Sequence, residues 1–110
     1  MDFQHKIAFD DLEWTDVGDS MKFKRYQQGD TQVRLVQWGR DMKHEDWCCK
    51  GHYGYVIDGK AQITYSDHTL TYEPGDVIFI PDGDQYQHRP KVLSDTFTFF
   101  SVEKNDQLRK

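Results

Sequence analysis

This sequence has no long apolar run, no apolar leader and few cysteines, and each absence excludes a class of protein. No stretch of its 110 residues approaches the roughly 20 apolar residues that a membrane-spanning helix needs. Its first residues contain no apolar segment of the kind that secretion signals carry. The two cysteines, Cys48 and Cys49, are adjacent, and neighbouring cysteines rarely form a disulfide because the bond strains the peptide between them. We therefore expect reduced thiols, a cytoplasmic location and no membrane partner.

An excess of basic charge is also missing. The chain has 14 Lys and Arg against 19 Asp and Glu, which gives a net charge of −5. Nucleic-acid binding needs a basic face, so we expect no nucleic-acid partner. Aromatic residues make up 15% of the chain, whereas disordered chains contain few aromatics. Length and composition together predict one folded domain over residues 1–110.

The sequence lacks helical periodicity, except that residues 10–16 are compatible with one helical turn. Short alternating segments separated by turn residues predict strands instead. The predicted strands are residues 21–26, 31–38, 52–57, 60–65, 69–73, 76–80, 86–89 and 96–102. Many short strands at this spacing predict an all-β sandwich or barrel.

Two turns carry specific expectations. Asp58-Gly59 is a dipeptide favoured in tight hairpins, so it predicts that residues 52–57 and 60–65 pair as antiparallel neighbours. The run Pro81-Asp82-Gly83 predicts a tight reversal in which Gly83 has a positive φ angle.

The segment that begins at Gly75 resembles the second signature motif of the cupin superfamily, because Gly75, Pro81 and Gly83 match it in type and spacing. The segment that ends at Gly59 resembles the first motif. The resemblance implies an all-β, small single-domain cupin β-barrel, also called a double-stranded β-helix or jelly roll, with its core at about residues 20–103. It also implies a homodimer, since small cupins usually dimerise and a second chain covers exposed strand edges.

The chain departs from the metal-ligand pattern of these motifs. In the first motif the glutamate position holds His52, and the two histidine positions hold Cys48 and Asp46. In the second motif the histidine position holds Tyr86, with His88 two residues later. The chain thus looks like a short single-domain bacterial cupin with degenerate metal-ligand positions.

Strand geometry indicates what these positions do. Side chains alternate between the two faces of a strand, so residues 46 and 48 share a face if that segment is extended, as do residues 86 and 88. We expect an interior ligand pocket that is lined by Asp46, Cys48, His52, Tyr86 and His88. Cys48, His52 and His88 are the candidate metal ligands, and such a mixed donor set suits Zn, Fe or Cu. The plainer interpretation is that Cys48 is a small buried apolar residue.

Three functions remain open at this point, and all of them have a small polar molecule as partner. The first is a metal-dependent small-molecule enzyme. The second is a metal-free isomerase or epimerase in which a histidine and a tyrosine move protons, with His52, Tyr86 and His88 as candidate catalytic residues. The third is a non-catalytic module that binds or senses a ligand. One fold hosts many functions, so the resemblance does not choose among them.

Overall fold

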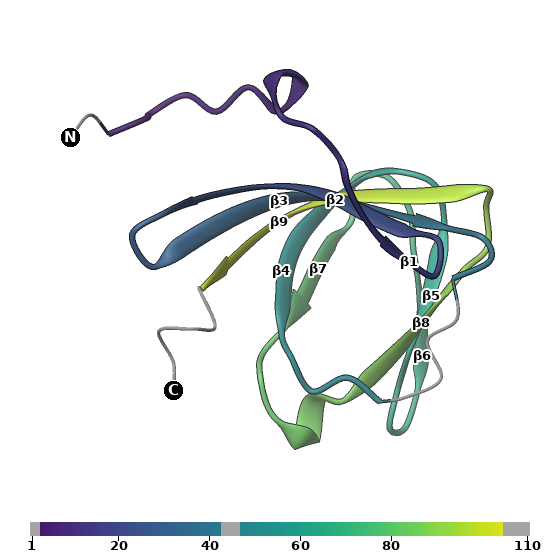
Figure 1. The fold of residues 1–110 in the computed structure, drawn as a ribbon. Helices are drawn as coiled ribbons and strands as arrows, with labels where there is room; N and C mark the ends of the chain where they lie inside the picture. Colours follow the sequence, from purple (N-terminus) through teal and green to yellow (C-terminus); the bar gives the residue numbers. More distant parts are fainter. Residues whose placement is uncertain (1–2, 43–46, 105–110) are drawn as a thin grey trace.

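Nine strands in two sheets form the described part of the computed structural model, which comprises residues 3–42 and 47–104. The larger sheet has the strand order β1-β2-β3-β9-β4-β7, and the smaller has the order β6-β5-β8. The strands are β1 (Thr15–Gly18), β2 (Met21–Gln28), β3 (Thr31–Gly39), β4 (His52–Asp58), β5 (Ala61–Tyr65), β6 (Thr69–Tyr72), β7 (Val77–Ile80), β8 (His88–Val92) and β9 (Thr96–Lys104). Figure 1 shows the two sheets facing each other across a common interior, so the predicted all-β barrel is confirmed.

Strands β3 and β9 give the interior an apolar and a polar end. They pair antiparallel, and alternate residues of each strand face inward. The successive inward pairs are Trp38 with Phe97, Val36 with Phe99, Arg34 with Ser101 and Gln32 with Glu103. Phe97 and Phe99 are fully buried, and burial of a side chain of this size stabilises the fold by about 1.5–3 kcal/mol. The functional side chains described below lie toward the polar end.

The prediction that residues 52–57 and 60–65 pair as a hairpin around Asp58-Gly59 is wrong. Strand β4 pairs with β7 and β9, whereas β5 pairs with β6 and β8, so the turn carries the chain from one sheet to the other. Val56 before the turn and Ala61 after it are both fully buried, which requires each strand to turn its apolar face to the shared interior. The likeness to the first cupin motif therefore does not depend on pairing between these strands.

The turn after β7 differs from the prediction in one respect. Gly83 has a φ of 130°, so the expected positive angle is confirmed. The following residues, however, form a 3₁₀ turn, η2 (Asp84–Tyr86), and the next strand begins only at His88. Near the N-terminus, the 3₁₀ turn η1 (Phe9–Asp11) and strand β1 occupy the region where one helical turn was expected. Asp46 lies outside the described residues.

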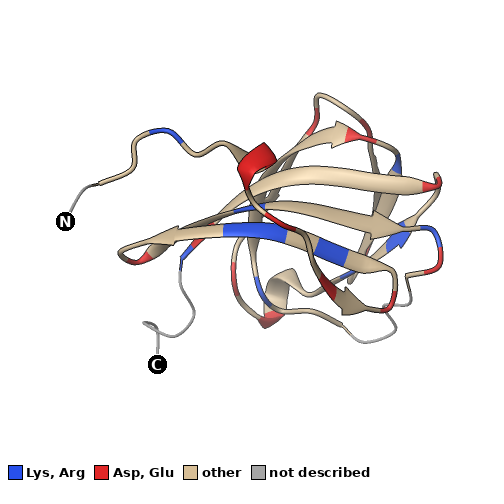
Figure 2. Cartoon of the chain, turned by 45° about the horizontal axis from the view of Figure 1, so that its top comes forward, with Lys and Arg blue, Asp and Glu red and all other residues tan. Residues whose placement is uncertain are grey.

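Charged residues are interspersed over the strands and turns of the described chain, as Figure 2 shows. Lys22 and Lys24 of β2 lie over the ring of Trp14, with each Nζ about 5 Å from the ring centroid (4.6 and 5.1 Å). These cations therefore make cation–π contacts and are not simply solvated. Within residues 3–42 and 47–104, no helix has the length and apolar character that crossing a bilayer requires.

The close approach of the backbone at Gly59 gives a testable prediction. A Cβ added there would collide with the carbonyl oxygen of Thr96 and lie 2.8 Å from Cα of Phe97, and Gly59 also has a φ of 91°. Gly75 has a similar φ of 97°, but an added Cβ meets nothing within 4 Å. We expect Gly75→Ala to lower the free energy of unfolding by about 1–2 kcal/mol, and Gly59→Ala by about 3 kcal/mol or more.

Urea denaturation of the two variants beside the wild type measures this difference. Both substitutions introduce a similar backbone strain, so the difference in unfolding free energy between the two variants measures the collision at Gly59. Equal losses in the two variants would contradict the prediction.

Candidate functional site

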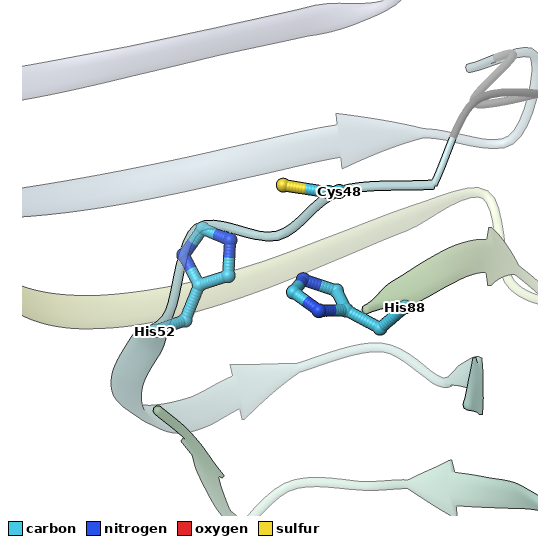
Figure 3. A group of neighbouring side chains, drawn as sticks. All are labelled: Cys48, His52 and His88. Carbon is cyan, nitrogen blue, oxygen red and sulfur yellow. The ribbon is translucent and has the colours of Figure 1, made fainter. Parts of the chain in front are cut away.

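Three side chains from separate segments meet between the two sheets. Cys48 precedes β4, His52 is the first residue of β4, and His88 is the first residue of β8. One ligand atom from each residue lies within 4.8 Å of those of the other two, and Figure 3 shows the three side chains turned toward a common space. The two imidazole rings meet edge to face, with centroids 5.5 Å apart. The structure therefore brings together three of the five expected pocket residues.

Backbone hydrogen bonds place Cys48 beside His88. The amide of Cys48 donates to the carbonyl oxygen of His88 at 2.9 Å, and the amide of His88 donates to the carbonyl oxygen of Cys48 at 3.0 Å. Residues that exchange both bonds in this way lie directly opposite each other, with their side chains on the same face. His52 pairs with Ile80 in the larger sheet, so the site joins the two sheets.

The ring of His88 is oriented by the backbone. His88 is only 3% exposed, and its Nδ1 lies 3.0 Å from the carbonyl oxygen of Tyr86. A carbonyl oxygen can only accept a hydrogen bond, so Nδ1 carries the proton in this arrangement. In the neutral ring Nε2 then keeps its lone pair, which is the form of histidine that binds metals, whereas a second proton on Nε2 gives a donor for the Cys48 thiolate.

The ring of His52 faces an acidic partner. Its Nδ1 is buried and makes no hydrogen bond among the described residues, but it lies 3.7 Å from Oε2 of Glu103. This distance is within the range of an ion pair and too long for a hydrogen bond. His52 and His88 thus each direct Nδ1 toward an oxygen acceptor.

Glu103 is a site residue that the sequence analysis missed. It is buried on β9, and its carboxylate binds side chains from two strands. Its partners are Gln32 at 2.8 Å, Arg34 at 2.7 and 3.2 Å, and Ser101 at 3.1 Å. Nζ of Lys50 also lies 3.7 Å from Oε1. The alternation along β9 could have revealed Glu103, because it has the same parity as the inward Phe97 and Phe99.

These contacts shift the protonation of the site. Hydrogen bonding with His52, and then with His88, lowers the pKa of the Cys48 thiol to about 5 although its burial opposes ionisation. Burial disfavours protonation of His52, but Cys48 and Glu103 outweigh it and raise the pKa of this imidazole. Burial likewise opposes ionisation of Glu103, but His52 and Arg34 hold the pKa of its carboxyl well below the usual range. At neutral pH the site therefore contains a thiolate and a buried carboxylate.

Tyr86 is not placed as the sequence analysis expected. It belongs to the 3₁₀ turn η2 and is 40% exposed, and within the described chain its hydroxyl makes no hydrogen bond with His52 or His88. Strand alternation does not apply to residues 86 and 88 because residue 86 lies outside a strand. Tyr86 contributes its backbone carbonyl to the site instead.

A cavity of about 550 Å³ adjoins the site at Glu103 but not at the three converging side chains. Its lining residues are Thr31, Gly51, Tyr53, Asp82, Val102, Glu103 and Lys104. Among the residues that the structure describes, Glu103 alone belongs both to this lining and to the partners of His52. The geometry of the thiolate and the imidazoles, and not this cavity, carries the chemistry of the site.

The donor set of the site fits a transition metal. One sulfur and two imidazole nitrogens are ligands of Zn, Fe and Cu, and three protein ligands leave a position open for a small molecule. Metal-binding histidines usually direct their second nitrogen to a carboxylate or a carbonyl oxygen, as His52 and His88 do. Metal–ligand bonds of about 2.0–2.3 Å would place the donor atoms about 3.3–3.8 Å apart, so the three groups need to close by only about 1 Å.

Comparisons with known proteins agree with this architecture. Residues 39–102 match the family described as Cupin domain. No curated protein matches the sequence.

Several solved structures have the same fold. An RmlC-like cupin from Shewanella frigidimarina has a TM-score of 0.74 at 12% identity, over 94% of this chain and 92% of that one. The polyketide cyclase RemF from Streptomyces resistomycificus has a TM-score of 0.73 at 16% identity, over 93% and 80%. A cupin-superfamily sugar phosphate isomerase from Silicibacter pomeroyi has a TM-score of 0.69 at 19% identity, over 88% and 73%. At these identities the likeness shows the fold alone.

The low pKa of Cys48 predicts an unusual pH dependence of its reactivity. In protein stripped of metal by a chelator, we expect the rate of Cys48 alkylation by iodoacetamide to be half-maximal near pH 5, because the thiolate is the reacting form. Cys49 is expected to react only at higher pH, since hydrogen bonding with Asp84 raises the pKa of its thiol. Peptide mass spectrometry separates the two modified sites, and Cys48→Ser serves as the control that removes the low-pH phase. A half-maximal rate for Cys48 near the ordinary thiol value of about 8.5 would refute the prediction.

Proposed function

Because the chain belongs to the cupin superfamily, we propose that its barrel binds a small polar molecule at a divalent transition metal held by Cys48, His52 and His88. The observation that carries this proposal is the shared orientation of the two histidines. Each directs Nδ1 toward an oxygen, which leaves Nε2 as the second nitrogen of the ring, available with the Cys48 thiolate. Zn, Fe and Cu are the metals that suit this donor set.

The residues of the site would then have distinct tasks. Cys48 supplies a negative charge, and His52 and His88 supply neutral donors from opposite sheets. When bound, the ion would polarise an oxygen-bearing group of the small molecule. The buried Phe99 packs edge to face with His52, at a centroid distance of 6.4 Å, and so helps to exclude water from that side. The cyclase and the isomerase of similar fold act on small organic molecules, which supports small-molecule chemistry for this chain as well.

Two alternatives to this proposal differ in how well the structure supports them. A non-catalytic binding module would use the same three residues, and only a turnover assay separates it from an enzyme. The metal-free isomerase needs a histidine and a tyrosine that share a proton path. The 40% exposure of Tyr86 and the lack of a bond from its hydroxyl to either histidine in the described chain argue against this pair.

A metal assay tests the main proposal. We expect the wild type to bind about one equivalent of Zn²⁺, as measured by titration calorimetry and by metal analysis of the purified protein. His52→Ala and His88→Ala each remove a ligand, so their affinity should fall by more than the 10–100-fold that loss of an outer-shell partner causes. His5→Ala is the matched control, because His5 is an exposed histidine near the N-terminus whose ring contacts Phe3. A wild type that binds no metal, or an equal loss in the control, would overturn the proposal.

We also propose that the protein forms a homodimer through the outer face of the larger sheet. This face carries an apolar patch whose side chains are 42–71% exposed: Tyr53, Tyr55, Ile57, Val77, Phe79 and Val102. The patch is continuous, because Tyr53 pairs with Phe79 on one side and with Val102 on the other. It includes β7, the edge strand of the sheet, and exposed edges are commonly covered by another chain.

The size of the patch agrees with a second copy as its occupant. Large aromatic side chains bury about 150–250 Å² each, so six half-exposed apolar residues offer about 500–600 Å². A standard interface buries about 800 Å² on each partner, and a surrounding polar rim supplies the remainder.

Substitution at the most exposed position of the patch tests the dimer. Phe79 is 71% exposed, and Phe79→Lys would place an unpaired charge within the proposed interface. We expect light scattering coupled to size exclusion to show a dimer for the wild type and a monomer for this variant. Leu70→Lys is the control, because Leu70 is 47% exposed on β6 of the other sheet. A monomeric wild type would rule the dimer out.

A further inference from the structure

We propose that Glu103 is the positioning residue for His52: its carboxylate determines which ring nitrogen of His52 carries the proton and therefore which nitrogen faces Cys48 and His88. This inference deepens the proposed metal site and rests on it for its effect on metal affinity. The effect on the proton position of His52 stands on geometry alone.

The carboxylate of Glu103 is held in one orientation. Oε1 accepts a hydrogen bond from Gln32, and Oε2 accepts bonds from Arg34 and Ser101. Arg34 reaches Oε2 with two nitrogens, Nε at 3.2 Å and Nη2 at 2.7 Å. Because donors on both oxygens oppose rotation of the group, Oε2 is a fixed acceptor beside His52.

The imidazole of His52 can satisfy its buried nitrogen at this acceptor. An unpaired buried polar atom costs about 1–3 kcal/mol, and Nδ1 of His52 is such an atom at 3.7 Å from Oε2. A shift of about 0.8 Å would bring the two atoms into hydrogen-bond range. The bond forms only if Nδ1 carries the proton, because a carboxylate offers no proton in return. A proton on Nε2 instead would set the lone pair of Nδ1 against a negative oxygen. The Cys48 thiolate is an acceptor on the Nε2 side of the ring and favours that form in metal-free protein, so Cys48→Ser is needed to leave Glu103 as the charged acceptor.

The two histidines of the site differ in how they are oriented. His88 is oriented by the backbone carbonyl of Tyr86, which no side-chain substitution removes. His52 depends on the side chain of Glu103, which comes from the last described strand. Substitution at Glu103 is therefore expected to change one histidine and leave the other as an internal reference.

A purely structural role for Glu103, as the counter-charge of the half-buried Arg34, makes a different prediction. Loss of the carboxylate would then lower stability without moving the proton on His52. The position of the proton on His52 therefore distinguishes a positioning role of Glu103 from a purely structural one.

The experiment compares variants that keep or remove the acceptor. Glu103→Gln keeps an oxygen next to His52, whereas Glu103→Met removes it. If Glu103→Met does not fold because Arg34 loses its partner, the double variant Arg34→Met/Glu103→Met removes both charges and takes its place. Ser101→Ala is the matched control, since it deletes one hydrogen bond to Oε2 but leaves the carboxylate.

Long-range ¹H–¹⁵N spectra report the proton position of both histidines, and they are recorded on metal-free protein that carries Cys48→Ser in every variant, at a pH at which the rings are neutral. In this background we expect the Nδ1–H form of His52 when Glu103 is unchanged, in Glu103→Gln and in Ser101→Ala. In the variants without the acceptor we expect a shift toward the Nε2–H form, with His88 unchanged. In the presence of Cys48, the Zn²⁺ affinity of these variants should fall about 10–100-fold in a separate titration at neutral pH.

The outcomes separate the two proposals. An unchanged Nδ1–H form of His52 in the methionine variants would overturn the positioning role of Glu103, whatever the Zn²⁺ titration shows. A wild type that binds no Zn²⁺ would overturn the metal site, while the spectra would still decide whether Glu103 positions His52.

Discussion

The interior of this barrel depends on strand β9, which lies between β3 and β4 in the larger sheet. Its inward side chains change along the strand from the buried Phe97 and Phe99 to Ser101 and Glu103. Because side chains alternate strictly along a strand, a shift of one residue would turn Phe97, Phe99 and Glu103 to the outer face of the sheet. The register of β9 therefore sets both the apolar core and the polar end that holds the site.

The polar end is stable because its charges are paired. A buried carboxylate is costly unless hydrogen bonds and opposite charges replace its water. Glu103 has both, from Gln32, Arg34 and Ser101, and its pKa stays below the usual range despite burial. The same arrangement stabilises the thiolate of Cys48 indirectly, because the imidazole of His52 lies between the thiol and the carboxylate of Glu103. Chemistry at Cys48 is thus linked to Glu103, which lies 55 residues further along the sequence.

Several features of the fold follow from local residue patterns. The hairpin of β2 and β3 and the positive φ of Gly83 were predictable because turn residues and alternation act over a few neighbouring positions. The Asp58-Gly59 turn shows the limit of this reasoning. A dipeptide specifies that the chain reverses, but the burial of Val56 and Ala61 against opposite sheets decides which strands pair.

The sequence by itself determined the β class of the protein, the places where the chain turns, and the presence of Cys48 and His52 at two of the family's ligand positions with His88 two residues beyond a third, because these depend on residue type and short spacing. Only the tertiary structure decided which of those groups meet. The bridge between Cys48 and His88 joins distant segments, the 3₁₀ turn at Asp84–Tyr86 puts Tyr86 outside the strand, and β9 brings Glu103 to His52. Such contacts arise from strand register across two sheets, and register is set by the packing of the whole interior.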